Sequence, residues 1–567
     1  MNSHCQFSDQ ELPLSDQTPS SSASGNEIVD GVPAPEGPTN LIDTDYQIGQ
    51  DNLTANKFGL SFDLHGKVFT ISALVIVFFV VTTLAFQNEV EPVFSSMRDW
   101  LTSNLAWFFM LSADIFVLLC VGLIVSPYGK IRLGGKYAKP DFSYTGWIAM
   151  LFAAGMAIGL IFYGVAEPIT HFSNAAGGIV AENGLRTDSA PLGAASGDSA
   201  KATQLAMAAT IYHWGLHPWA IYAVVALALA LFAFNKGLPL TMRSIFYPIL
   251  GERIWGWPGH IIDILAVFAT LFGLATSLGI GASQATAGME HLFGIPNNNV
   301  TMVLLIMGIT AIALLSILAG MDKGVQRLSQ INMILAFLLL VFVIAVGPTL
   351  YLVGGFFKNL GAYVTNLPAL SNPFGRDDRG FVEGWTAFYW AWWISITPLV
   401  GMFVARISRG RSVREFLVAV LLIPSIVSII WMTAFGNTAI HQVVADGFQG
   451  VENAALELQL FVMLSQLPFS SITSFLGIVL VIVFFTTTSD SGSLVIDSLA
   501  AGGKINAPRV QRVFWAIIEG VIAIALLLGG GLTALQAGVI STGLPFTLVL
   551  LACCYAIVKG LMSEPRN

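Results

Sequence analysis

Charged residues are scarce in this chain of 567 residues: Asp, Glu, Lys and Arg together make up only 11% of it. Soluble domains carry about 25% charged residues, so this composition excludes a water-soluble protein. Cysteines are also few, and the four lie in the polar N-terminal region or in apolar runs, which excludes a disulfide framework. Residues 1–56 contain no Lys, no Arg and no apolar core, so we do not expect a signal peptide there.

The motifs of common enzyme classes are missing as well. The sequence has no HExxH, GxSxG or P-loop motif, and the run S-D-S-G-S at residues 489–493 has no neighbouring base that would activate a serine. The net charge of −8 comes largely from the acidic N-terminal region and does not favour nucleic acid as a partner. We therefore expect no enzyme activity, no bound cofactor and no nucleic-acid partner.

Long apolar runs dominate what is present. Apolar residues make up 55% of the chain and the mean hydropathy is +0.73. Runs of about 20 apolar residues are long enough to cross a bilayer, and their backbone groups must be bonded within each run, as in a helix. The sequence predicts an all-α polytopic membrane protein with twelve spans, at residues 68–87, 105–126, 143–164, 208–234, 261–283, 300–320, 331–353, 386–404, 416–436, 472–488, 511–530 and 540–559.

The basic residues predict how the chain is oriented. With the N-terminus inside the cell, 20 of the 26 Lys and Arg residues fall on the inner side, as the positive-inside rule requires. Both termini are therefore expected in the cytoplasm. Two further stretches lie between spans. Residues 354–366 are predicted to form an interfacial helix, and residues 437–470 a long loop that can contain another helix.

Two of the spans contain helix-breaking residues at corresponding places. The third span has Gly155, Gly159 and Gly164, whereas the eighth has Pro398 and Gly401. Each glycine costs a helix about 1 kcal/mol relative to alanine. A GxxxG packing face would explain the first span alone. Breaks five spans apart instead favour a five-plus-five inverted-repeat transporter core with broken helices, preceded by two peripheral helices, in which unwound carbonyls bind a cation.

Tryptophan is concentrated inside two spans rather than at the membrane interfaces. Five of the 13 lie in the runs Y-H-W-G-L-H-P-W-A-I-Y and Y-W-A-W-W-I-S. On an ideal helix Trp214, Trp219 and Tyr222 fall within an arc of about 140°. Several π-faces around one pocket bind quaternary ammonium groups, which have no N–H to donate. We therefore predict such a site and include Trp390 and Trp393 of the second run among its binding residues. Ordinary packing of bulky side chains in the core is the alternative explanation.

Several polar residues lie at membrane depth. His213 and His217 are spaced as metal ligands, although packing and bonding between helices are the simpler explanation. Glu167 can end a hydrated pathway or cap a helix at the interface. The run F-F-T-T-T-S-D-S-G-S places Thr487 and Thr488 in the tenth span, where hydroxyl oxygens either ligate a small cation or bond between helices.

At this level of detail the sequence resembles the betaine/choline/carnitine transporter family over residues 60 to 560. Residues 388–416, F-Y-W-A-W-W-I-S-I-T-P-L-V-G-M-F-V-A-R-I-S-R-G-R-S-V-R-E-F, resemble the family signature almost throughout, and G-M-A-I-G-L-I-F-Y-G-V-A-E-P and H-W-G-L-H-P-W-A-I-Y add support. The resemblance implies a sodium-coupled importer of a quaternary ammonium osmolyte, foremost glycine betaine, working by alternating access as a homotrimer in the bacterial inner membrane. It implies an ammonium cage of Trp214, Trp219, Tyr222 and Trp393, and a sodium site from the backbone oxygens of Ala153, Met156 and Phe484 and the hydroxyls of Thr487 and Thr488.

The expected organisation follows from the spans and the resemblance together. It comprises a disordered acidic tail (1–60), two peripheral helices (61–127), a first repeat with an interfacial helix (143–366), a second repeat (386–560) and a short C-terminal tail (561–567).

Several residues depart from the family pattern, and they bear on which substrate is bound and which ion is coupled to transport. Ala157 replaces the middle glycine of the family's G-M-G-I-G motif and is counted as a binding residue, because its methyl group would reshape the contact with the substrate's polar end. Ile396 stands where betaine carriers often have another Trp. Proton-coupled choline carriers tend to place Asp where Gly159 stands here, and sodium-independent carnitine exchangers use an Arg that the fifth span lacks. These features favour sodium, with Thr276 and Ser277 as candidates for a second site. A proton-coupled choline, carnitine or sulfonium transporter remains the alternative, and a channel or membrane osmosensor is the alternative of another class.

Overall fold

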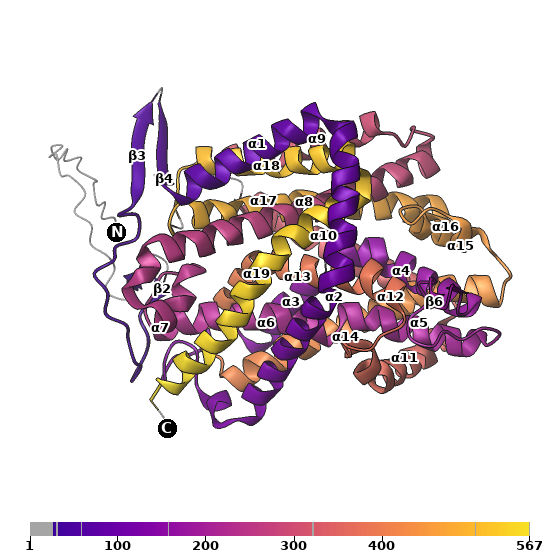
Figure 1. Ribbon diagram of the computed structural model, residues 1–567, viewed down its shortest axis with the longest axis horizontal. Coiled ribbons are helices and arrows are strands. Elements are labelled where there is room, and N and C mark those ends of the chain that lie inside the picture. The colour runs from indigo at the N-terminus through magenta and orange to yellow at the C-terminus, as the bar shows by residue number, and fades with distance from the viewer. Residues whose placement is uncertain are drawn as a thin grey trace, which may run out of the picture.

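The computed structural model describes residues 27–29, 32–57, 59–156, 158–319, 322–504 and 506–565, and this part of the chain is almost entirely helical (Figure 1). Within it, 11 helices are long and apolar enough to cross a membrane, and one further pair of helices, bent by 58° at a short break, raises the number to 12. The prediction of an all-α polytopic membrane protein with about twelve spans is confirmed.

The helices that make up these spans extend beyond the apolar runs in several places. They are α1 (Val68–Ala85), α2 (Gln87–Val125), the bent pair α3 (Tyr144–Gly155) and α4 (Ile158–Gly177), the pair α5 (Ser199–Trp214) and α6 (Leu216–Ala230), α8 (Trp257–Phe293), α9 (Asn299–Ala319), α10 (Asp322–Val346), α13 (Ala387–Ile407), α14 (Val413–Val444), α17 (Ser470–Ala500), α18 (Arg509–Leu528) and α19 (Gly531–Met562).

Shorter elements connect the spans. The helices among them are α7 (Tyr247–Leu250), α11 (Thr349–Ser371), α12 (Arg379–Phe381), α15 (Gly450–Asn453) and α16 (Gln459–Ser465), with single 3₁₀ or π turns at Pro127–Lys130, Leu231–Asn235, Arg243–Phe246, Gly251–Trp255 and Val382–Thr386. The strands form three antiparallel pairs: β1 (Glu27–Val29) with β2 (Val32–Pro33), β3 (Asn52–Lys57) with β4 (Leu60–His65), and β5 (Ala181–Glu182) with β6 (Leu185–Arg186).

The spans form an inner and an outer group. The most apolar stretch of α5–α6 is 94% buried within the protein, and that of α13 is 83% buried. By contrast α9 is 22% buried and α1 is 33% buried, so most of their apolar surface faces outward, where lipid would lie. Helix α13 packs against α6, and α17 packs against α8. The two best-buried spans, α5–α6 and α13, therefore carry five of the 13 tryptophans.

The predicted break of the eighth span is wrong. Helix α13 runs from Ala387 to Ile407 without interruption, with Pro398 inside it. Proline has no N–H for the carbonyl four residues earlier, which is that of Ile394. The hydroxyl of Thr397 donates to this carbonyl at 2.7 Å, so the unpaired oxygen is satisfied within the helix and the helix continues.

Two connecting regions also differ from the prediction. The seventh span ends at Val346, before Gly347 and Pro348, and α11 begins at Thr349 instead of residue 354. Proline is well suited to the start of a helix and not to its interior, which places the boundary there. Helix α14 continues to Val444, so only the later part of the predicted loop at 437–470 lies outside it.

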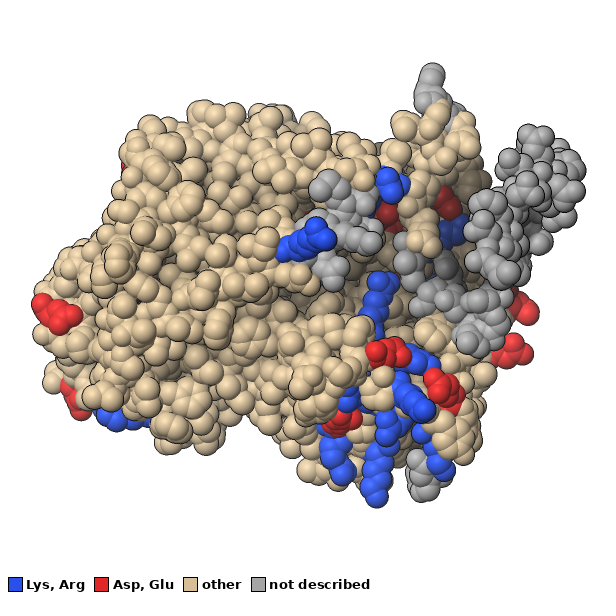
Figure 2. Space-filling view, turned by 180° about the vertical axis from the view of Figure 1, so that it is seen from behind, with Lys and Arg blue, Asp and Glu red and all other residues tan. Residues whose placement is uncertain are grey.

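The connections between spans meet at two opposite ends of the molecule. At one end Arg132 pairs with Ser412 in a β-bridge, and Lys236 forms an ion pair with Glu564 near the C-terminus. Figure 2 shows Lys and Arg gathered at one end of the protein, beside a broad surface with few charges. At the other end Arg186 pairs with Asp188 at 2.8 Å, and the backbone N–H of Leu192 donates to Asp378. Loops predicted on one side of the membrane therefore contact each other.

The N-terminal region was predicted to be a disordered tail over residues 1–60. Residues 1–26 lie outside the described residues. From residue 32 the structure differs, because this segment packs along the basic end of the molecule. Glu36 pairs with Arg409 at 2.9 Å, Tyr46 stacks on Trp255, and Asn52 donates to the carbonyl of Ala501. These contacts come from loops hundreds of residues away, which local sequence does not reveal.

Candidate functional site

The break between α3 and α4 opens one wall of a central cavity. Helix α3 begins at Tyr144, after the Ser143 side chain accepts a hydrogen bond from the Gly146 N–H, and it ends at Gly155. Met156 has extended backbone angles, and the two helices diverge by 58°. The predicted break of the third span is therefore confirmed. Ala157, also predicted to shape the site, lies outside the described residues.

Gly159 lets two tryptophan rings approach the backbone of α4. A Cβ atom placed on Gly159 would lie 2.7 Å from the Trp392 ring and 2.8 Å from the Trp214 ring. Both distances are far inside van der Waals contact, where carbon atoms are about 3.5–4.0 Å apart. The glycine is therefore needed for close approach of these rings.

A second interruption, between α5 and α6, lies next to the aromatic residues of the fourth span. Gly215 separates the two helices and adopts non-helical backbone angles. Trp214 is the last residue of α5, whereas Trp219 and Tyr222 lie on the first turns of α6. All three are buried and line the cavity, so the prediction that they share one side of the span agrees with the structure.

The aromatic rings of the cavity stand at steep angles to one another. Trp393 lies 5.0 Å from Trp214 and 5.6 Å from Tyr222, both at 89° between ring planes, and Trp219 lies 5.3 Å from Tyr222 at 69°. Edge-to-face contacts of this kind are favourable and turn the faces of different rings toward one space. That space has a volume of about 190 Å³, below the range typical of sites for drug-sized ligands. The structure therefore brings Trp214, Trp219, Tyr222 and Trp393 together around a cavity suited to a small molecule.

Trp390 does not line this cavity, in contrast to the prediction. Its ring stacks on His217 at 5.6 Å and meets Tyr212 edge-on. Trp392, which the prediction left out, lines the cavity and stacks on Trp393 at 5.6 Å.

Helical geometry explains the difference between the two tryptophans. Ile396, also in the lining, lies about 40° around the helix from Trp392 and about 120° from Trp390. A helical wheel centred on Ile396 would have selected Trp392 and Trp393.

Each cavity-lining tryptophan of α13 is fixed by its indole N–H. Trp392 donates to the hydroxyl of Ser277 on α8 at 3.1 Å, and Trp393 donates to the backbone carbonyl of His213 at 3.0 Å. Of the two residues proposed for a second cation site, Ser277 lines the cavity, whereas the Thr276 hydroxyl donates to the carbonyls of Phe272 and Leu535.

Oxygen atoms suited to a cation lie at one edge of the same cavity. Of the five predicted ligands, Ala153, Met156 and Thr488 line it. Phe484 and Thr487 are not among the lining residues, and the Thr487 hydroxyl donates to the carbonyls of Val483 and Phe484 within α17. The C-terminal end of α3, with its partial negative charge, borders the cavity there. Backbone and hydroxyl oxygens are the ligands that hard cations take, so this edge fits Na⁺ by its chemistry.

His213 and His217 point to different partners instead of a shared metal. His213 lies 2.6 Å from a carboxylate oxygen of Glu167, and His217 lies 3.0 Å from one of Asp114. Glu167, His171 and His213 are buried, and their ligand atoms lie within 4.8 Å of one another. Both ring nitrogens of His213 are already hydrogen-bonded, the second to Thr386. This arrangement favours bonding between helices over a metal site.

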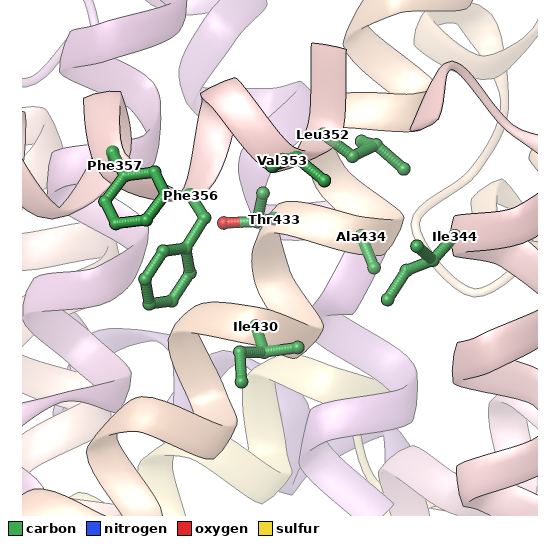
Figure 3. A pocket seen from close by; sticks show the side chains of 8 residues that line it. All are labelled: Ile344, Leu352, Val353, Phe356, Phe357, Ile430, Thr433 and Ala434. Atoms are coloured by element: carbon green, nitrogen blue, oxygen red, sulfur yellow. The ribbon is translucent and has the colours of Figure 1, made fainter. Parts of the chain in front are cut away.

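Another cavity, of about 250 Å³, lies between α10, α11 and α14 and shares none of these residues (Figure 3). Its lining is apolar apart from Thr433, whose hydroxyl oxygen accepts a hydrogen bond from Asn359. Without further polar groups it cannot orient a charged or zwitterionic molecule, so it is not the substrate site.

Comparison with known proteins decides the family. The family model described as BCCT, betaine/carnitine/choline family transporter, matches residues 67–566. The chain belongs to this family. A glycine betaine/proline/choline transporter of Vibrio parahaemolyticus is 63% identical over 538 residues, which cover 94% of this chain and 97% of the relative.

Other relatives agree with this assignment. Glycine betaine transporter 1 of Vibrio parahaemolyticus is 52% identical over 529 residues, with 92% of this chain and 97% of the relative covered. A glycine betaine transporter of Acinetobacter baylyi is 40% identical over 512 residues, with 90% and 74% covered. Betaine/choline transport across a membrane is therefore the activity class of this family member.

Proposed function

We propose that this BCCT family member is a symporter that uses the sodium gradient to import glycine betaine by alternating access. The observation that supports this proposal is the cavity that five aromatic rings line together with the end of a broken helix and Thr488. An aromatic wall suits the trimethylammonium group, and helix-end oxygens suit a cation. Names of the relatives supply glycine betaine as the first substrate to test.

Sodium coupling is supported by the residues near the break. Thr488 lines the cavity, and its hydroxyl makes no hydrogen bond within the part of the chain that the structure describes. A hydroxyl oxygen there is available to a cation. Gly159 has no carboxylate that would carry a proton instead, and α8 contains neither Lys nor Arg to replace the cation.

The placement in the membrane is part of the proposal. Both the C-terminus and the gathered Lys and Arg side chains lie at one end, which by the positive-inside rule is the cytoplasmic end (Figures 1 and 2). A homotrimer in the bacterial inner membrane is proposed from the resemblance to the family.

The test is uptake of labelled glycine betaine into liposomes containing the purified protein, with sodium, proton and voltage gradients imposed separately. Competition by choline, carnitine, proline and ectoine ranks the substrates. Uptake driven by a proton gradient alone would favour a proton-coupled choline carrier, and conductance without substrate would favour a channel.

Removing one aromatic wall of the cage is expected to weaken substrate binding. Trp393→Leu and Trp219→Leu should each raise the Kd of glycine betaine by about 5- to 30-fold, because one desolvated cation–π face contributes about 1–2 kcal/mol. Trp393→Phe should be milder, since a π-face remains. Equilibrium binding to purified protein at saturating sodium measures the effect.

Trp390→Leu is the matched control for these cage variants, because Trp390 is buried on the same helix but does not line the cavity. If Trp393→Leu and Trp219→Leu bind glycine betaine as tightly as the unmodified protein, the substrate lies elsewhere.

Removing a proposed sodium ligand is expected to change sodium dependence first. Thr488→Ala should raise the sodium concentration for half-maximal uptake more than it raises the KM of glycine betaine at saturating sodium. Coupled binding requires that each ligand shift the affinity of the other by the same factor. Thr486→Ala is the control, because its hydroxyl donates to the Ile482 carbonyl within α17. An unchanged sodium dependence in the Thr488 variant would remove this residue from the site.

A further inference from the structure

A buried carboxylate lies directly behind the aromatic cage. Glu167 on α4 is fully buried, and its two oxygens meet four side chains. One oxygen lies 2.6 Å from Nδ1 of His213 and 3.2 Å from Nε2 of His171. The other accepts the indole N–H of Trp214 at 2.7 Å and the hydroxyl of Tyr389 at 2.5 Å. Trp214 lines the cavity, so this carboxylate is one hydrogen bond away from the proposed substrate.

The hydrogen bonds indicate which groups carry protons. An indole N–H can only donate, so the Glu167 oxygen facing Trp214 is an acceptor. His213 satisfies both of its neighbours in a neutral form, with Nδ1–H donating to Glu167 and Nε2 accepting the hydroxyl of Thr386 at 2.9 Å. A carboxylate with a neutral His213 therefore pairs every group in this part of the cluster.

His171 does not neutralise the carboxylate either. Its Nε2 faces Glu167, whereas its Nδ1 is buried without a hydrogen-bond partner among the described residues. A protonated ring would leave a charged N–H donor unpaired in the interior, at a higher cost than an unused lone pair. No Lys or Arg forms an ion pair with Glu167 in the described part of the chain. With both histidines neutral, the cluster carries a net negative charge that no Lys or Arg among the described residues balances.

We propose that Glu167 is a positioning residue that gives the cage its preference for a cation over a neutral group of the same shape. It fixes the ring plane of Trp214 and, as an anionic acceptor, increases the electron density of the indole that faces the substrate. A buried charge without a partner is unfavourable, and the bound quaternary ammonium group supplies the missing positive charge. This inference rests on the proposed function, because it assumes that the cavity binds the substrate.

Neutral isosteres of the substrates separate the role of charge from that of shape. In 3,3-dimethylbutanoate a carbon atom replaces the nitrogen of glycine betaine, and 3,3-dimethylbutan-1-ol stands in the same relation to choline. Glu167→Gln keeps the size of the side chain and removes its charge. We expect this variant to raise the Kd of glycine betaine and choline by roughly tenfold, the equivalent of one strong cation–π contact, and to change the Kd of each isostere by less than about twofold.

The matched control is Glu519→Gln. Glu519 on α18 is also fully buried, and it accepts a hydrogen bond from the Ser489 hydroxyl at 2.9 Å, outside the cavity lining. Its variant should keep the ratio of cation to isostere affinity of the unmodified protein. A merely structural role of Glu167 would lower the affinity for cation and isostere alike, and that result would overturn the proposal.

A double-mutant cycle tests whether the effect passes through Trp214. Trp214→Phe keeps an aromatic ring but removes the N–H that Glu167 accepts. If Glu167 acts through this hydrogen bond, the double variant should lose little more cation preference than the single variant with the greater loss. Independent effects of the two substitutions would instead add. Additive losses would overturn the coupling. Glu167→Asp should restore part of the preference, because it returns the charge.

Three further outcomes have separate meanings. If Glu167→Gln is not recovered as folded protein, the isostere ratio of Trp214→Phe decides the proposal, which requires a loss of cation preference. One equivalent of zinc in the purified, unmodified protein would also overturn it, because the carboxylate would then be a metal ligand. Failure of the unmodified protein to bind glycine betaine at all would contradict the proposed function instead.

Discussion

Uptake of glycine betaine against its gradient is expected to disappear when sodium is replaced by potassium on both sides of the liposome. The proposed cation edge, with Ala153, Met156 and Thr488, borders the same cavity as the aromatic rings, so an empty cation site leaves the α3–α4 break without its positive charge. One sodium ion moving inward at about −100 mV supplies roughly 2.3 kcal/mol, enough for about a fiftyfold substrate gradient. Without it no stored energy drives accumulation.

The measurement uses labelled glycine betaine at fixed membrane potential, with and without an inward sodium gradient. N-Methylglucamine serves as the second sodium substitute, and choline is avoided because it is a candidate substrate. Equilibration without sodium is compatible with the proposal, whereas accumulation is not. Uphill uptake driven by protons in sodium-free liposomes would overturn the ion assignment and leave the aromatic cage untouched.

Gly159→Ala is expected to lower the affinity for glycine betaine by at least about tenfold. The added methyl group would lie 2.7 Å from the Trp392 ring and 2.8 Å from the Trp214 ring, so at least one of these rings must move. Overpacking of this kind costs about 1–3 kcal/mol, and here the displaced atoms belong to the proposed binding surface. Equilibrium binding and the KM for uptake measure the change.

Gly308→Ala provides the matched control for the same substitution. Gly308 lies within α9, and a Cβ atom there would meet nothing within 4 Å. This variant should bind and transport as the unmodified protein does. Normal affinity in Gly159→Ala would mean that the rings of the cage are free to shift. The same crowding makes Gly159→Asp a poor test of proton coupling, because the side chain would displace the rings whatever its charge.

Local sequence was sufficient to predict the helical membrane spans. The scarcity of charge and the recurring apolar runs predicted a polytopic helical protein, because a backbone in lipid must form its hydrogen bonds within each span. The break after Gly155 was predictable for a related reason, since several glycines in one apolar run weaken the helix. The same did not hold for Pro398, whose missing hydrogen bond is replaced by the neighbouring Thr397.

The side of its helix on which each aromatic residue lies was only partly predictable. Residues on one short helix, such as Trp219 and Tyr222, keep a fixed angular relation, so their common direction follows from spacing. The choice between Trp390 and Trp392 depends on which neighbour α13 faces at that level, and this is fixed by its packing against α6 and α8. The prediction therefore included Trp390, which does not line the cavity, and left out Trp392, which does.

The sequence by itself determined the class of the protein, its spans, the break after Gly155 and the common direction of Trp219 and Tyr222, because these depend on local hydropathy and helical periodicity. Tertiary structure alone decided the partners of the buried polar groups. Glu167 meets His213 and Trp214 from α5 and Tyr389 from α13, at separations of 46, 47 and 222 residues. Such contacts form because buried polar groups must find partners wherever the packed helices bring them, and no local pattern records which partner that will be.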